Sequence, residues 1–158
     1  MEATIDRVRT TLPDLTFTRS FEAPRALVWK AWTHPEHVAA WWGPHGYVNA
    51  RCIVEPVAGG AFRIDMQDPD GVTRRMGGWF THVDEPERLV LCTTVASRGA
   101  IVAESAHDMR LDQHDGRTRM TLRSRMVRAE PFMLPRIGGM EEGWRQSLER
   151  LTAILRAV

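Results

Sequence analysis

The sequence predicts an α+β fold in which helices cover one side of an antiparallel sheet. The apolar residues repeat at the helical period of about 3.6 between residues 24 and 42, and at a period of about 2 in most of the segments between residues 47 and 126. A helical period returns from residue 137 to the end. Because an antiparallel sheet buries only one face, the long last helix is the natural cover for that face.

The first strand and two short helices are expected between residues 15 and 42. In LTFTRSFE, apolar and polar side chains alternate as they do in a strand. Pro24 suits the start of the first helix, whose apolar stripe comprises Leu27, Val28, Ala31 and Trp32. Pro35 lies in the first turn of the second helix, and Thr33 or His34 would cap it; Thr33 and Glu36 have the spacing of a capping box.

Trp41 and Trp42 stand at the end of the second helix, directly before Gly43 and Pro44. Adjacent helical positions point about 100° apart, so the two indoles cannot fill one core position. We expect one ring to face inward beside Trp32, and the other to cover the joint between the helices and the sheet. Packing is the simplest role for such large rings, and a place at a ligand entrance is the alternative.

Six strands are expected between residues 47 and 126, and the last two form the clearest hairpin. Asp115 and Gly116 favour a two-residue turn. The pairs that this turn sets opposite one another include Leu111–Met120, Met109–Leu122, His107–Ser124, Asp112–Arg119 and Asp108–Arg123. Apolar residues meet apolar residues and aspartates meet arginines, so one register satisfies both faces.

The chain ends in a long helix whose apolar residues step by three or four. They are Ile137, Met140, Trp144, Leu148, Leu151 and Leu155. We expect Met140, Trp144, Leu148 and Leu151 to face the sheet. Residues 14–158 are expected to form one domain, and the polar residues 1–13 a flexible N-terminal arm.

Composition and charge favour a cytoplasmic globular protein. The chain has 158 residues and a net charge of +1 with His neutral, so its overall charge does not suggest a polyelectrolyte partner such as nucleic acid. The alternating arginines of residues 117–125 are interpreted as a solvated face. No segment is apolar enough for a signal peptide or for membrane insertion. Cys52 and Cys92 are expected to be free thiols.

Several motifs together resemble the activator of heat-shock protein 90 ATPase-like family, within the START-like, helix-grip (SRPBCC, birch-pollen-allergen-type) superfamily. They are FEAPRALVWKAWTHPEHVAAWWGPHG, AGGAFRIDM, PDG, PERLV and EEGWRQSLERLTAIL, in this order from about Leu15 to Leu155. The resemblance implies a helix-grip fold, with a curved antiparallel sheet of about seven strands around a long C-terminal helix and two short helices after the first strand. It also implies a hydrophobic cavity between sheet and helix, where some superfamily members bind lipids, polyketides or plant hormones.

We expect this cavity to bind a hydrophobic or aromatic small molecule. Its expected walls are Trp42, Phe62, Ile64, Phe80, Met109, Met120, Leu122, Met140 and Trp144. Two histidines would add polar groups. His107 shares the phase of Met109, and His82 shares the phase of Phe80, although Trp79 and Val83 make the opposite phase of that strand apolar too and leave the orientation of His82 open. An inward histidine can bind a ligand or act as a base, or it can simply be hydrogen-bonded inside the core.

Two other functions stay open. A chaperone ATPase-activating interaction protein is suggested by the family resemblance alone, and a cyclase or aromatase by the enzymes in the superfamily. Binding without catalysis is favoured, so no catalytic residue and no cofactor are expected. No metal is expected either, since His34, His37 and His45 have no further ligand at a suitable spacing. A homodimer is also left open.

Overall fold

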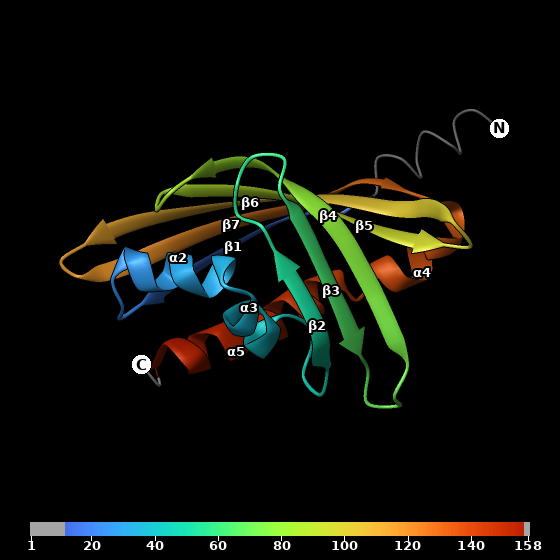
Figure 1. The fold of residues 1–158 in the computed structure, drawn as a ribbon, viewed down its shortest axis with the longest axis horizontal. Helices are drawn as coiled ribbons and strands as arrows, with labels where there is room; N and C mark the ends of the chain where they lie inside the picture. Colours follow the sequence, from blue (N-terminus) through green and yellow to red (C-terminus); the bar gives the residue numbers. More distant parts are fainter. Residues whose placement is uncertain (1–11, 157–158) are drawn as a thin grey trace.

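The computed structural model describes residues 12–156 and contains one seven-stranded antiparallel sheet, with strand order β1-β7-β6-β5-β4-β3-β2 (Figure 1). The strands are β1 (Asp14–Phe21), β2 (Val48–Val54), β3 (Ala61–Gln67), β4 (Thr73–Asp84), β5 (Arg88–Ser97), β6 (Ala100–His114) and β7 (Arg117–Ala129). The helices are α2 (Arg25–Thr33), α3 (Pro35–Trp41), η1 (Pro131–Met133), α4 (Leu134–Ile137) and α5 (Met140–Arg156).

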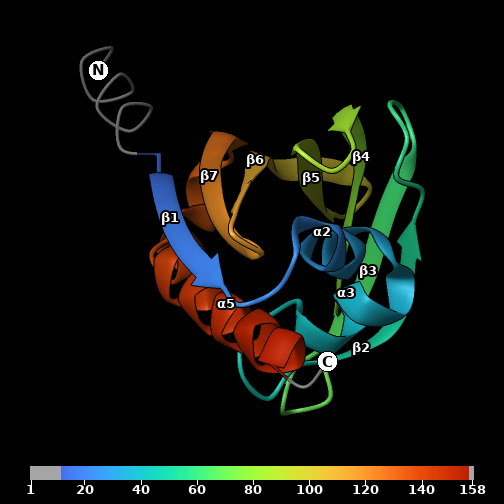
Figure 2. The ribbon, with the colours of Figure 1, turned by 90° about the vertical axis from the view of Figure 1, so that its left-hand side faces the viewer.

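The sheet curves around the helices, and α5 lies in its concave side (Figure 2). This is the α+β arrangement that the periodicity predicts and the helix-grip fold that the family resemblance implies, with both short helices after the first strand and six strands after them. Residues 1–11 of the expected N-terminal arm lie outside the described residues. No helix in the described range 12–156 is long and apolar enough to cross a membrane.

The junction between α2 and α3 differs from the expected capping box. Thr33 is the last residue of α2, and its hydroxyl donates to the backbone oxygen of Trp29 at 2.8 Å. His34 is therefore the residue that precedes α3, and its side chain makes no capping hydrogen bond. The capping box of Thr33 with Glu36 is wrong, because the threonine hydroxyl bonds within the preceding helix.

β4 changes phase in its middle, where the pairing with β5 shifts between Phe80 and His82. One extra residue in β4 forms a β-bulge, and a bulge reverses the alternation of all later side chains. Phe80 is 1% exposed before the bulge, and Val83 packs against the core after it.

Gly78 on the same strand allows a close approach of β4 and β5. A Cβ atom at Gly78 would collide with the backbone oxygen of Cys92, so only glycine is tolerated at this position.

The β6–β7 hairpin has the predicted register at every expected pair. Asp115 and Gly116 have φ values of 52° and 76°, and this tight turn requires positive φ at both positions. The ion pairs in the structure are not those between directly facing residues that the register suggested, such as Asp108 with Arg123. Asp108 accepts hydrogen bonds from Arg88 on the neighbouring strand β5, at 2.9 and 3.1 Å, and Arg123 donates to Asp14 on β1.

The last helix buries its predicted face against the sheet. Trp144, Leu148 and Leu151 are at most 8% exposed, whereas Met140 is only half-buried. The helix does not extend back to Ile137, because α4 ends there and the pair Gly138–Gly139 separates it from α5. Glycine is a poor helix former, which accounts for the interruption.

Candidate ligand-binding cavity

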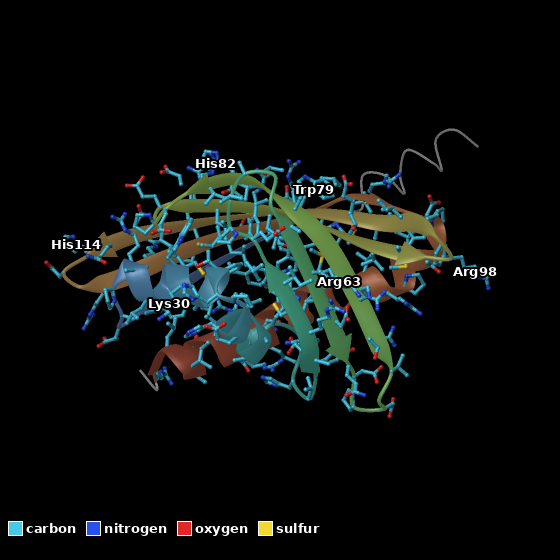
Figure 3. The ribbon with its side chains drawn as sticks, in the orientation of Figure 1. Lys30, Arg63, Trp79, His82, Arg98 and His114 are labelled. Carbon is cyan, nitrogen blue, oxygen red and sulfur yellow. The ribbon has the colours of Figure 1, made fainter. Side chains whose placement is uncertain are left out.

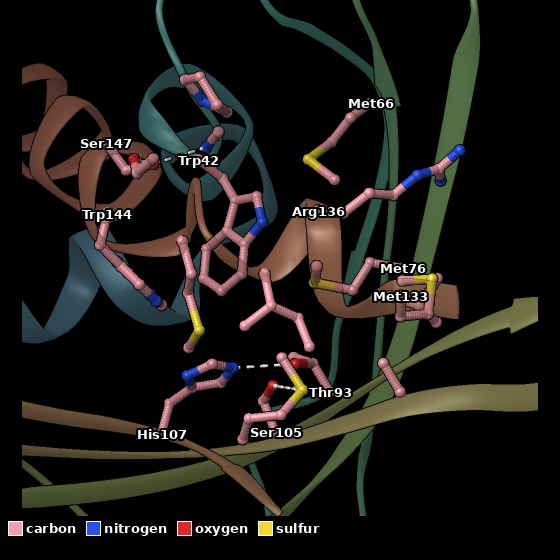
Figure 4. A pocket seen from close by; sticks show the side chains of 18 residues that line it. Trp42, Met66, Met76, Thr93, Ser105, His107, Met133, Arg136, Trp144 and Ser147 are labelled. Atoms are coloured by element: carbon pink, nitrogen blue, oxygen red, sulfur yellow. Dashed lines mark hydrogen bonds between the residues drawn. The ribbon is translucent and has the colours of Figure 1, made fainter. Parts of the chain in front are cut away.

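A cavity of about 230 Å³ lies between the first turns of α5, the η1–α4 segment and the concave face of the sheet (Figure 4). Its lining is mostly apolar. Five methionines contribute to it, namely Met66, Met76, Met126, Met133 and Met140. Thioether side chains are flexible and polarisable, so they adapt to apolar molecules of different shapes.

Two tryptophans form one wall of the cavity. Trp42 and Trp144 pack edge to face with ring centroids 5.4 Å apart, and Trp144 stacks on Trp32 at 6.3 Å. Trp41 is fully buried against Trp32, and its indole N–H donates to the backbone oxygen of Ala31 at 2.9 Å. Both members of the predicted pair are therefore buried, but only Trp42 reaches the cavity.

Trp42 faces the cavity because it lies one residue beyond α3 and has extended backbone angles, with φ −66° and ψ 133°. Arg150 of α5 holds this segment by donating hydrogen bonds of 2.9 to 3.2 Å to four backbone oxygens, those of Ala40, Trp42, Gly43 and Pro44. Burial lowers the pKa of the Arg150 guanidinium. The sequence places Arg150 on the polar side of its helix, so helical periodicity alone missed this contact.

A buried polar row crosses the sheet next to the cavity. His107 on β6 has its Nε2 atom 2.8 Å from the Thr93 hydroxyl on β5, and its Nδ1 atom 2.8 Å from the Ser124 hydroxyl on β7. Burial lowers the pKa of His107 to about 4, so the imidazole is neutral near pH 7. Thr93, Ser105 and His107 all line the cavity.

Four of the predicted site residues line the cavity: Trp42, His107, Met140 and Trp144. Six others are buried in the core and are not part of the lining: Phe62, Ile64, Phe80, Met109, Met120 and Leu122. Their inward orientation is correct. They lie where α2, α3 and the rest of α5 pack on the sheet, so side chains of these helices cover them.

The expectation that His82 faces the cavity is wrong. His82 is exposed on the outer side of the sheet, as is Trp79 (Figure 3). The β-bulge after Phe80 reverses the phase of the strand, so a residue two positions later no longer shares its face. Apolar residues stand in both phases of this strand, so their alternation did not decide which face His82 takes.

Sequence reasoning missed the hydroxyl-bearing residues of the cavity floor. Thr93 and Ser105 are direct partners in the β5–β6 register, and both are buried. The predicted hairpin register did place Ser124 opposite His107, and that pair was the one available signal of a polar row. The β5–β6 turn at Arg98–Gly99 also has positive φ at both positions. A register shift between Val95 and Ala96 follows it, so counting back from this turn does not place Thr93 opposite Ser105.

A groove of about 600 Å³ adjoins the cavity and shares five of its lining residues: Met66, Met76, Val95, Met133 and Arg136. The groove also has Arg74 and Arg75 in its wall, which form ion pairs with Asp68 and Asp65. Arg136 lies on the side of the cavity away from Trp144 (Figure 4). Within residues 12–156, Arg136 forms no ion pair, and it is the only charged residue in the cavity lining.

The described residues contain no group of three or more His, Cys, Asp or Glu side chains that could hold a metal ion. The described cavity lining also has no carboxylate. The arrangement can therefore bind an apolar molecule and contact its polar atoms through hydroxyl groups. A bound molecule would lie beside Trp42 and Trp144 and would change their fluorescence.

Residues 22–156 match the family model described as activator of Hsp90 ATPase homolog 1-like protein. The chain belongs to this family. The match covers nearly all of the helix-grip fold, from the residue after β1 to the last residue of α5. No functionally curated protein matches the chain.

Solved structures of this Hsp90 ATPase activator-like fold extend the comparison. A protein from Arthrobacter aurescens is 26% identical, covers 95% of this chain and 93% of its own, and superposes with a TM-score of 0.80. A protein from Nitrosomonas europaea is 25% identical over 91% of this chain and 94% of its own, with a TM-score of 0.76. The AHSA1 protein from Silicibacter pomeroyi, at 23% identity, covers 92% and 99% with a TM-score of 0.78.

Proposed function

We propose that this chain binds a small apolar or aromatic molecule in the cavity under α5. The observation that carries the proposal is the cavity itself, about 230 Å³ in volume, with tryptophan and methionine walls and a few polar groups at its floor. Ligand sites in proteins combine apolar walls with a small number of placed polar groups. The walls would take the body of the ligand, and the floor would orient it.

The size of the cavity limits the ligand. Small-molecule sites commonly occupy roughly 300–1,000 Å³, and the inner cavity is smaller than that range. The adjoining groove of about 600 Å³ provides further space toward Arg136. We therefore expect a compact apolar or aromatic body inside the cavity, with any longer or more polar end in the groove.

Binding is favoured over catalysis by the surroundings of His107. Both of its ring nitrogens are within hydrogen-bond distance of buried hydroxyl groups, and neither partner is a carboxylate. A general base needs a free nitrogen within reach of the substrate proton and a pKa near the working pH. The pKa of about 4 and the two occupied nitrogens make His107 a poor general base.

Fluorescence titration tests the proposal, because Trp42 and Trp144 line the cavity. Flat aromatic compounds and fatty acids form the ligand panel. Ala103 is 3% exposed and lines the cavity on β6, so Ala103→Leu would fill space that the ligand needs. We expect at least one saturable ligand, and at least tenfold weaker binding to Ala103→Leu.

The matched control is Ala100→Leu, the same change at an exposed position of the same strand. Its affinity should equal that of the wild-type protein. The proposal fails if no compound of the panel binds saturably. It also fails if Ala103→Leu and Ala100→Leu bind a ligand equally well.

A further inference from the structure

A chain of two hydrogen bonds connects a fully buried serine on the concave face of the sheet to the cavity. It runs from the Ser124 hydroxyl on β7, through the His107 imidazole on β6, to the Thr93 hydroxyl on β5. The three residues are 0%, 4% and 3% exposed. A neutral imidazole has one N–H donor and one acceptor nitrogen, so the two hydrogen bonds must run in the same direction along the chain.

Ser124 sets that direction. Within the described residues, its hydroxyl has no hydrogen-bond partner other than the Nδ1 atom of His107. If Nδ1 carried the proton, the serine hydroxyl would accept from it, and its own hydrogen would be buried without an acceptor. Such an unpaired buried donor is strongly disfavoured. Ser124 therefore donates to Nδ1, and the ring proton lies on Nε2.

The Nε2–H group then donates to the oxygen of Thr93, which leaves the hydrogen of the Thr93 hydroxyl available. No acceptor for that hydrogen is present in the described part of the chain, and Thr93 lines the cavity. Figure 4 shows the Thr93 and His107 side chains joined at the cavity floor, next to Ser105. The Thr93 hydroxyl at the cavity floor can therefore donate to a bound molecule, and its hydrogen bond with His107 fixes its orientation.

We propose that Thr93 is a ligand-binding residue whose hydroxyl donates to an oxygen atom of the bound molecule, with Ser124 and His107 as positioning residues. The inference rests on the proposed function and specifies its ligand class: an apolar or aromatic compound with a carbonyl oxygen. A carboxylate is disfavoured at this floor, because the neighbouring imidazole is neutral and Arg136, the one charged residue among the described lining residues, lies across the cavity.

The first test needs no ligand. Nitrogen-15 NMR of histidine-labelled protein near pH 7 distinguishes the two neutral tautomers of the imidazole ring, and His107→Gln identifies the His107 signals by their loss. We expect the Nε2–H tautomer. The Nδ1–H tautomer would overturn the inference and would leave the proposed binding function standing.

The second test compares 2-acetylnaphthalene with 2-isopropenylnaphthalene, which has nearly the same shape but a methylene group in place of the carbonyl oxygen. Calorimetric titration of Thr93→Val should show roughly 3- to 10-fold weaker binding of the ketone than in the wild-type protein, and unchanged binding of the hydrocarbon. Thr93→Ser keeps the hydroxyl and should keep the affinity for the ketone.

These measurements distinguish failure of the role of Thr93 from failure of the proposed binding function. Equal effects of Thr93→Val on the ketone and on the hydrocarbon, or no effect on either, would overturn the role of Thr93 while cavity binding stands. If neither compound and no member of the ligand panel of flat aromatic compounds and fatty acids binds the wild-type protein, the proposed function fails and this inference fails with it.

Discussion

At the scale of single residues, the buried His107 couples the stability of the fold to pH. Burial lowers its pKa from 6.5 to about 4. Between these values the unfolded chain binds a proton that the folded chain does not, so stability rises with pH across this window. The contribution is complete above about pH 6.5 and is lost as the pH falls toward 4. From pH 7 to pH 5 we expect a loss of about 2 kcal/mol.

Urea unfolding at pH 7 and pH 5 measures this loss. The control is His107→Gln, which has no group that titrates at this position, so comparison with it cancels the contributions of the other titratable groups. The wild-type protein should lose about 2 kcal/mol more than the variant over the same interval. Equal losses in the two proteins would show that His107 is not buried in its neutral form.

The two site histidines show how far the sequence predicts single residues. His107 was placed correctly, because the Asp115–Gly116 turn fixes the register of its strand. His82 was misplaced, because a β-bulge reverses the phase of β4 between Phe80 and Val83, and the apolar residues in both phases did not show where that reversal lies. A turn with a strong local preference is visible in the sequence, whereas a bulge depends on the pairing with the next strand.

At the scale of elements, Arg150 joins α5 to the end of α3. Its guanidinium donates to four backbone oxygens around Trp42, three of them beyond the last residue of α3. Arg150→Ala leaves these partly buried oxygens without that partner. Since hydrogen bonds to charged groups contribute about 1.5–3 kcal/mol, we expect a destabilisation of about 2 kcal/mol in urea unfolding.

Arg156→Ala is the matched control, because Arg156 is an exposed arginine in the last turn of the same helix. Surface substitutions of this kind change stability by about 0.5 kcal/mol or less. Equal stabilities of the two variants would contradict the role of Arg150 in holding the segment that carries Trp42.

Trp144 of α5 lines the cavity and joins the helix to an aromatic cluster. It is 8% exposed and packs on Trp32, Trp42 and His107. Trp144→Ala should destabilise the fold by about 3–5 kcal/mol, because it removes a large buried ring and enlarges the cavity. Thermal unfolding measures the effect, with the exposed neighbour Arg145→Ala as the control. A loss below about 1 kcal/mol would mean that the helix does not depend on this contact.

The elements were more predictable than their contacts. The β6–β7 register follows from its turn and from apolar pairing, and it is confirmed. The ion pairs are not those of the facing residues, because long arginine side chains reach across to other strands, as Arg88 reaches Asp108. The two glycines at 138 and 139 indicate the break before α5, because glycine disfavours a helix. The helical spacing of Ile137 and Met140 nevertheless favoured a helix that continued across them.

At the scale of the whole molecule, the cavity lies where the helices leave part of the concave face of the sheet uncovered. α2 packs on β6 and β7, α3 packs on β2 and α5, and these contacts fill one end of the concave face. The space lies at the other end, beside η1 and α4. Apolar alternation marks inward positions in the covered and the uncovered parts of the sheet alike, so the sequence indicates the buried face but not which part of it the helices leave open.

Native mass spectrometry of the protein purified from its own host tests ligand binding in this cavity most directly. We expect the wild-type protein and Ala100→Leu to carry the same small-molecule adduct, which is released on collisional activation. Ala103→Leu, which fills the cavity, should carry none. The account is contradicted if Ala103→Leu keeps the adduct, or if the wild-type protein carries no small molecule at all.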